Sequence, residues 1–309
     1  MSGSLPPAAP ESRMTCFVAT LISHPSRPAL TADLANSACR TVGASAPVWL
    51  AQGIACDIAL PDPVDPAQAA AALAGALTGA AIDIAVQEVR NRRKQLLIAD
   101  MDSTMIDQEC IDELADLVGL KEHVAAITAR SMNGEIAFEP ALRERVALLK
   151  GLPASVVGDV IASRITLASG GRTLVRTMRA SGAWTALVSG GFTVFTGPVA
   201  AMIGFDENIA NVLHETEGRL AGTVAEPILG RAAKAEALTT ISARLGISPA
   251  QAIAVGDGAN DLDMLRLAGT GVALHAKPAV AAQAKIRIDH GDLTALLYLQ
   301  GYRQSEFRD

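Results

Sequence analysis

Aromatic residues are scarce in this sequence. Only 3 % of the 309 residues are Phe, Trp or Tyr, whereas half are apolar and Ala-rich stretches are frequent. All-β sandwiches are enriched in aromatic and β-branched residues, so this composition favours a helix-rich α/β protein. A chain of this length can form one large domain or two smaller ones.

Long apolar runs and a strong charge imbalance are also missing. No uninterrupted apolar run reaches roughly 18 residues, so we expect no membrane-spanning segment and no membrane partner. The formal net charge of −6 offers no positive surface for nucleic acid or for anionic lipid. One short basic cluster, residues 90–94, is interpreted as a solvated linker. The chain also lacks G-x-x-x-x-G-K-[ST] and G-x-G-x-x-G, which argues against a nucleotide-binding fold.

Cysteine is rare, and its spacing indicates neither a zinc site nor a disulfide framework. The four cysteines are scattered without a C-x-x-C pair, at Cys16, Cys39, Cys56 and Cys110. We therefore expect reduced, mostly buried thiols. Residues 1–13 are rich in Pro and Ser and lack the basic start and apolar core of a secretory signal. We predict a disordered N-terminus and a cytoplasmic protein.

Residues 14–90 are predicted to form a small ferredoxin-like α+β domain. The pattern predicts strands at 16–22, 48–52, 54–60 and 82–88, with helices at 29–42 and 66–77. This β-α-β-β-α-β order with short connections is typical of a ferredoxin-like unit. The pattern resembles the small-molecule-binding ACT domain. The resemblance leaves open whether this unit binds serine or only dimerises.

The sequence pattern of residues 91–309 predicts a doubly wound parallel sheet with a helical cap. An uninterrupted apolar run at 96–99 indicates a strand buried on both faces. Helices alternate with strands beyond about residue 170, which is typical of such a sheet. Helical spacing over about 105–170 predicts a cap inserted after the first strand, and a β-hairpin is expected at 210–215 and 219–224.

Three of the predicted buried strands end in polar loops. These loops are Asp100-Met101-Asp102-Ser103-Thr104, Ser189-Gly190-Gly191 and Gly256-Asp257-Gly258-Ala259-Asn260-Asp261. The carboxyl ends of parallel strands lie at one edge of a sheet, so we expect these loops to meet. Each alone has an ordinary interpretation as a turn, and Ser103 or Thr104 could simply cap the next helix. Their convergence favours a catalytic site.

These loops resemble the motifs of the haloacid dehalogenase superfamily of phosphotransferases, with Lys234 as the remaining motif residue. The resemblance covers residues 96–301. It implies a Mg²⁺-dependent phosphomonoesterase that forms an aspartyl phosphate. The motifs look most like those of the members that hydrolyse O-phosphoserine to serine and phosphate, the last step of serine biosynthesis. A homodimer is an arrangement that the sequence allows.

The resemblance assigns a role to each motif residue. Asp100 is expected to attack phosphorus, and Asp102 to protonate the leaving oxygen and later activate water. The metal would be held by Asp100, Asp257 and the backbone carbonyl of Asp102. The phosphoryl group would be bound by Ser189, Gly190, Lys234 and Asn260, with Asp261 supporting the metal and the lysine from behind.

Four residues of the predicted cap match positions that contact substrate in these relatives: Glu109, Met132, Phe138 and Arg145. The opposite charges of Glu109 and Arg145 suit the α-ammonium and α-carboxylate of an amino acid. Taken without the resemblance, both could be ordinary surface charges on the cap helices.

Three alternatives stay open at this point. Another phosphatase of the superfamily would share every motif and differ only at the four cap positions. A receiver-type signalling module also carries a phosphorylated Asp at a strand end, but it lacks a second acid, so Asp102 favours turnover. A pure amino-acid sensor would bind serine through residues 14–90 and release no phosphate.

Overall fold

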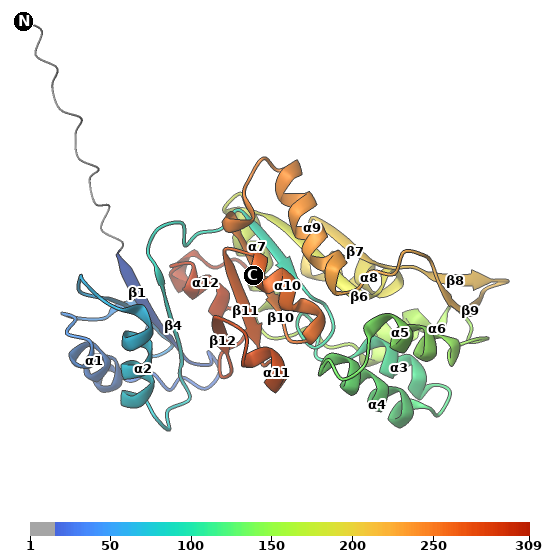
Figure 1. Cartoon of the computed structure of the whole chain (residues 1–309), viewed down its shortest axis with the longest axis horizontal. Coiled ribbons are helices and arrows are strands. Elements are labelled where there is room, and N and C mark those ends of the chain that lie inside the picture. The colour runs from blue at the N-terminus through green and yellow to red at the C-terminus, as the bar shows by residue number, and fades with distance from the viewer. Residues whose placement is uncertain (1–15) are drawn as a thin grey trace, which may run out of the picture.

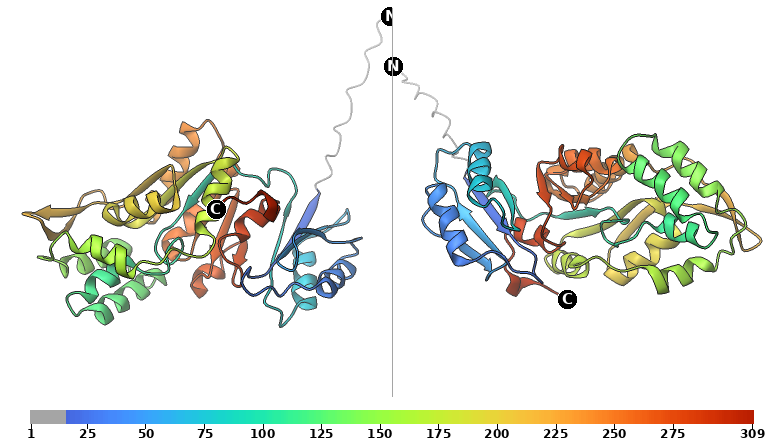
Figure 2. Two further views of the ribbon diagram at one scale, coloured as in Figure 1. Left: turned by 180° about the vertical axis from the view of Figure 1, so that it is seen from behind. Right: turned by 90° about the horizontal axis from the view of Figure 1, so that it is seen from below.

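The computed structural model describes residues 16–309, apart from the side chain of Met132. The segment predicted to be disordered, residues 1–13, lies outside the described residues. A six-stranded sheet occupies the centre of the molecule, with a small N-terminal unit at one end of the long axis and a helical cap at the other (Figures 1 and 2). No helix of residues 16–309 is both long enough and apolar enough to cross a bilayer.

The N-terminal unit is a four-stranded antiparallel sheet with strand order β2-β3-β1-β4 and two helices on one face. Its elements are β1 (Phe17–Ile22), α1 (Ala32–Thr41), β2 (Val48–Ala51), β3 (Ala55–Ala59), α2 (Pro66–Ala76) and β4 (Asp83–Glu88). Thr31 and Asp65 cap the two helices by accepting backbone N–H bonds in the first turn. The predicted α+β fold of this unit is therefore confirmed. Its thiols Cys39 and Cys56 are free and buried, as predicted, while Cys16 is free and exposed.

The second face of this sheet packs against the rest of the chain. Ile22 and Ala85 belong to the same apolar cluster as Tyr298 of helix α12 (Ala295–Leu299). Asp83 accepts backbone N–H bonds from residues 289–291, the loop after the last strand of the central sheet. The N-terminal unit is thus joined to the central sheet by both apolar and polar contacts.

The prediction that residues 90–94 form a solvated linker is wrong for Arg92 and Lys94, although Arg90, Asn91 and Arg93 are exposed. The Arg92 side chain is 11 % exposed and lies 2.7 Å from Asp57. It also donates to the carbonyls of Tyr298 and Leu299 at the end of α12. Burial lowers the pKa of the Lys94 ammonium, which donates to the Ala250 carbonyl. Arg92 is buried because it satisfies a carboxylate and helix-terminal carbonyls together.

The central sheet is parallel throughout, with strand order β12-β11-β10-β5-β6-β7. Its strands are β5 (Leu96–Ala99), β6 (Trp184–Phe192), β7 (Glu207–Asn211), β10 (Ala252–Gly256), β11 (Thr270–Leu274) and β12 (Ile286–Ile288). One face is covered by α7 (Gly171–Ala180), α8 (Thr193–Ile203) and α12, and the other by α9 (Arg231–Arg244), α10 (Leu262–Leu267) and α11 (Pro278–Ala281). The two faces bury alternate residues of β5, which confirms the predicted doubly wound fold.

The predicted hairpin is partly wrong. Ala210 and Asn211 belong to β7, an edge strand of the central sheet, and only β8 (Leu213–Thr216) and β9 (Arg219–Val224) form the hairpin. The chain leaves the sheet at the exposed Val212 without a Gly or Pro to mark the change. Because apolar and polar residues continue from the end of β7 into β8 without such a break, the sequence pattern did not distinguish these two strands.

The cap contains four helices: α3 (Cys110–Asp116), α4 (Lys121–Met132), α5 (Phe138–Ala147) and α6 (Val156–Arg164). The segments that lead into and out of it pair with each other, since Asp107 N–H donates to the Thr166 carbonyl and Ala168 N–H to that of Met105. The β8–β9 hairpin docks on the cap, where Gly151 N–H donates to the Leu220 carbonyl at 2.8 Å. The cap stands over the carboxyl end of β5.

Candidate active site

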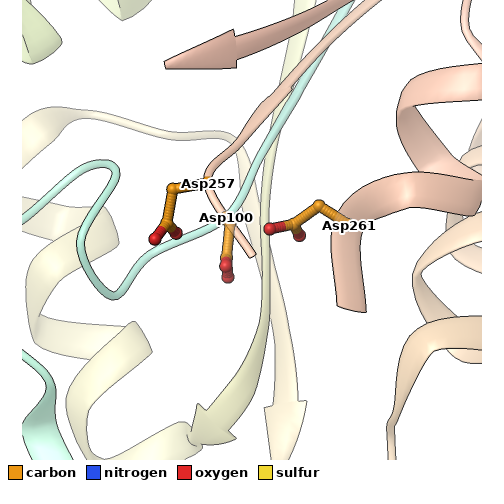
Figure 3. A group of neighbouring side chains, drawn as sticks. All are labelled: Asp100, Asp257 and Asp261. Atoms are coloured by element: carbon orange, nitrogen blue, oxygen red, sulfur yellow. The ribbon is translucent and has the colours of Figure 1, made fainter. Parts of the chain in front are cut away.

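Three aspartates from separate loops meet at the carboxyl edge of the central sheet. Asp100 follows β5, Asp257 follows β10, and Asp261 ends the short 3₁₀ turn before α10. Their carboxylates converge (Figure 3), and one oxygen of each lies within 4.8 Å of the others. All three side chains are buried. Three buried carboxylates at this separation repel one another strongly unless cations lie among them.

Lys234 supplies one positive charge. This residue lies in the first turn of α9, and its ammonium lies 2.7 Å from Asp100 and 2.6 Å from Asp261. Burial alone would lower the pKa of this ammonium, but the two carboxylates outweigh it and raise the pKa, so the lysine stays protonated. Burial and the neighbouring Asp261 still raise the pKa of Asp100 well above its usual range. The single positive charge of Lys234 therefore does not neutralise the three carboxylates.

The remaining acid fits a hard divalent cation. Burial, with the nearby Asp261 carboxylate, raises the pKa of Asp257 to about 6. Its Oδ2 is buried and forms an ion pair with the Lys277 ammonium at 3.1 Å, with no other partner within residues 16–309. Carboxylate and carbonyl oxygens are the ligands that Mg²⁺ prefers. The all-oxygen donor set, in which the Asp257 Oδ2 contacts only the Lys277 ammonium among the residues described, is compatible with Mg²⁺ at this position.

Asp102 faces a pocket next to these acids. Its Oδ1 accepts the Cys110 N–H at 3.1 Å, and burial raises the pKa of the carboxyl. Ser103 turns the chain here with φ of 54°, a left-handed conformation that non-glycine residues rarely adopt. A raised pKa favours the protonated carboxyl, which is the form that a general acid needs.

Ser189, Gly190 and Gly191, near the end of β6, line the same pocket as Asp102. The Gly191 N–H donates to the Ser189 hydroxyl at 2.8 Å. A Cβ on Gly190 would lie 2.7 Å from the Phe138 ring, and one on Gly191 would lie 2.9 Å from an Asp102 oxygen. A side chain at either position would force Phe138 or Asp102 to move, whereas the bare backbone leaves room for a ligand to approach.

The cap contributes both charged residues that the sequence indicated. Glu109 accepts the Ser103 hydroxyl proton at 2.8 Å, and its pKa is raised well above the usual range by burial and by Asp102 and Asp257. Arg145 is 2 % exposed and donates to the Ala141 carbonyl and the Thr128 hydroxyl. These bonds fix the guanidinium, and within residues 16–309 its other N–H groups make no hydrogen bond, so they can bind a ligand.

Most of the predicted residues line one pocket beneath the cap: Asp100, Asp102, Glu109, Phe138, Arg145, Ser189, Gly190 and Asn260. Lys234, Asp257 and Asp261 are not among the lining residues, but each lies next to Asp100, which is. Met132 ends α4, and its side chain lies outside the described residues. The buried Asn260 Oδ1 has no hydrogen-bond partner in the described part of the chain.

Sequence reasoning missed Lys277, and it considered Thr104 only as a possible helix cap. Lys277 pairs with Asp257, and Thr104 donates to the same carboxylate at 3.3 Å. Lys277 follows β11, whose carboxyl end lies at the same edge of the sheet as the three motif loops. The rule that located those loops would have drawn attention to Lys277 as well.

Comparisons with known proteins agree with this geometry. Residues 97–266 match the family model described as haloacid dehalogenase-like hydrolase. A phosphoserine phosphatase of Streptomyces coelicolor is 41 % identical over 78 % of this chain, which spans only 59 % of that protein. One of Polaromonas is 43 % identical over 72 % of this chain and 96 % of its own length.

Solved structures are similar as well. A phospho-aspartyl intermediate analogue of phosphoserine phosphatase aligns with a TM-score of 0.64 and 39 % identity, covering 67 % of this chain and 98 % of that one. A hydrolase of the same family from Salmonella enterica aligns over 92 % of this chain and 98 % of its own, with a TM-score of 0.81 and 29 % identity. The matched family model spans more than half of the sequence and contains the three carboxylates and Lys234, so this chain belongs to the haloacid dehalogenase-like hydrolase family.

Proposed function

We propose that this protein is a Mg²⁺-dependent phosphomonoesterase that hydrolyses O-phosphoserine to serine and phosphate. The observation that carries the proposal is one pocket that places Glu109 and Arg145 opposite Asp100 and the Ser189 loop. A carboxylate and a guanidinium suit the ammonium and carboxylate of an amino acid, and the loop suits a phosphoryl group. The names of the Streptomyces and Polaromonas relatives support the same substrate.

In the proposed reaction, an Asp100 oxygen forms a bond to phosphorus while the bond from phosphorus to the seryl oxygen breaks. Asp102 gives its proton to that oxygen, and then accepts a proton from the water that hydrolyses the aspartyl phosphate. Lys234, Ser189 and Asn260 hold the phosphoryl oxygens. Mg²⁺ bound by Asp100, Asp257 and the Asp102 carbonyl would supply the positive charge that lets a carboxylate approach a phosphate dianion.

The proposal assigns different tasks to two parts of the chain. We propose a division near residue 90, with catalysis confined to the later part and the cap at about 105–170. Every residue to which a catalytic or substrate-binding role is assigned lies between Asp100 and Asp261. The N-terminal unit is assigned no catalytic task, and its task is either serine binding or dimerisation.

Phosphate release from a panel of phosphomonoesters tests this function. With Mg²⁺, O-phosphoserine should give the highest kcat/KM, well above phosphoethanolamine, which lacks the carboxylate, and glycerol phosphate, which lacks both charged groups. Excess chelator should lower the rate at least about 100-fold, because the metal supplies several kcal/mol of charge stabilisation. Ca²⁺ should not restore it, since calcium takes more ligands at longer distances.

Two results would contradict the proposal. Full activity in chelator would refute the metal assignment. Equal rates across the panel would mean that Glu109 and Arg145 do not select the substrate, and would favour a phosphatase of the same family with a different substrate.

A further inference from the structure

Asn211 is a buried polar residue that no step of the proposed reaction uses. It ends β7 and stands at the base of the β8–β9 hairpin, with 2 % of its surface exposed. Its Nδ2 donates to the Gly190 carbonyl at 2.8 Å and to the Leu229 carbonyl at 3.2 Å, and its Oδ1 accepts the Leu229 N–H at 2.7 Å. Only one orientation of the amide satisfies all three bonds.

The hydrogen bond from Asn211 to the Gly190 carbonyl replaces backbone pairing that is interrupted between β6 and β7. Val188 pairs with Ile209 and Phe192 pairs with Asn211, so residues 189–191 of β6 lie opposite Ala210 alone. The loop therefore bulges out of the ladder at the place where the phosphoryl group is proposed to bind. A buried carbonyl without a partner is costly, and the Asn211 side chain supplies the donor that the ladder lacks here.

The hydrogen bond that holds the Gly190 carbonyl also fixes the orientation of the Gly191 N–H group. The Gly190 C=O and the Gly191 N–H belong to one peptide plane and point in opposite directions. That N–H donates to the Ser189 hydroxyl oxygen at 2.8 Å. With its oxygen accepting this bond, Ser189 can direct its own proton toward a phosphoryl oxygen. Glycine on both sides lets the plane rotate readily, so the orientation depends on an outside partner.

We propose that Asn211 is a positioning residue that holds the Gly190–Gly191 peptide in the orientation needed for phosphoryl binding. Through Leu229 it also fixes the segment that leads into α9, where Lys234 lies five residues further on. The Asn211 side-chain amide thus sets the position of the Ser189 hydroxyl relative to the Lys234 ammonium. The inference rests on the proposed function, because it concerns the same phosphoryl subsite.

The substitution Asn211→Asp tests this role. Aspartate has nearly the same shape and can still accept the Leu229 N–H, but it cannot donate to the Gly190 carbonyl. The dissociation constant of inorganic phosphate in the presence of Mg²⁺ should rise about 10- to 100-fold, as expected when a buried acceptor loses its partner and a binding loop is misplaced. The kcat/KM values for O-phosphoserine and for an aryl phosphate should fall by the same factor, because both substrates use the phosphoryl subsite.

Thr196→Val is the matched control. Thr196 is fully buried and donates to Asn208, another residue of β7, at 2.8 Å, the same length as the bond to Gly190. This variant should lower the melting temperature without changing phosphate affinity. If Asn211→Asp fails to fold, Asn211→Ser avoids the buried charge while its hydroxyl is too short to reach Gly190.

The outcomes separate the inference from the function on which it rests. Melting temperatures that fall alike in both variants, with phosphate affinity unchanged in both, would show that Asn211 is only structural and overturn the inference. A wild-type protein that neither binds phosphate nor releases it from O-phosphoserine would instead overturn the proposed function.

Discussion

Asp100→Asn should lower the hydrolysis of O-phosphoserine by at least about 10⁴-fold while the protein stays folded. The amide keeps the shape of the side chain but is not a nucleophile. Lys234 would still be paired with Asp261 at 2.6 Å, so its buried charge keeps a partner. Because burial already raises the pKa of Asp100, a neutral side chain at this position should not destabilise the metal-free protein.

Single-turnover phosphate release and thermal unfolding measure the two parts of this prediction. Asp107→Asn is the matched control, because Asp107 lies on the same segment after β5 but its side chain is exposed. The control should keep the activity of the wild type. Substantial turnover by Asp100→Asn would rule out covalent catalysis by this residue.

Arg145→Ala and Arg145→Lys should each lower kcat/KM for O-phosphoserine about thirty-fold or more, corresponding to about 2–5 kcal/mol for a charge-assisted bond in a desolvated pocket. The guanidinium is held by Ala141 and Thr128, so its planar fork is fixed in direction. A lysine cannot reproduce paired N–H bonds to a carboxylate. An aryl phosphate lacks the amino-acid end, and its slow hydrolysis should change little.

Arg143→Ala is the control for this pair of variants. Arg143 lies on the same helix, but its side chain is 51 % exposed and pairs with Glu226 at the surface. The Arg143→Ala variant should retain hydrolysis of both O-phosphoserine and the aryl phosphate. If both activities fall together in the Arg145 variants, the residue supports the cap; if neither falls, O-phosphoserine is not the substrate.

The central sheet could be predicted because its signals are local. The apolar run at 96–99 forms β5, and the run from residue 252 forms β10, each buried on both faces. Parallel strands then place Asp100, Ser189 and Asp257 at one edge without further information. The position of the acids therefore followed from topology, whereas their roles followed from the resemblance to a family.

Contacts between distant segments could not be predicted in this way. Arg92 is buried because Asp57 and the end of α12 meet at its position, and neither lies near it in the sequence. The edge strand β7 escaped notice because its alternation continues into the hairpin. Asn211 gave no signal at all, since its importance depends on a bulge in the neighbouring strand.

The central claim is that Asp100 takes the phosphoryl group from O-phosphoserine. Rapid acid quenching of the enzyme with O-phosphoserine carrying a labelled phosphoryl group, followed by peptide mapping, tests it most directly. We expect a label on the peptide that contains Asp100, absent from Asp100→Asn and absent when Mg²⁺ is removed. A label on Ser189, or steady phosphate release with no labelled peptide at any quench time, would contradict it.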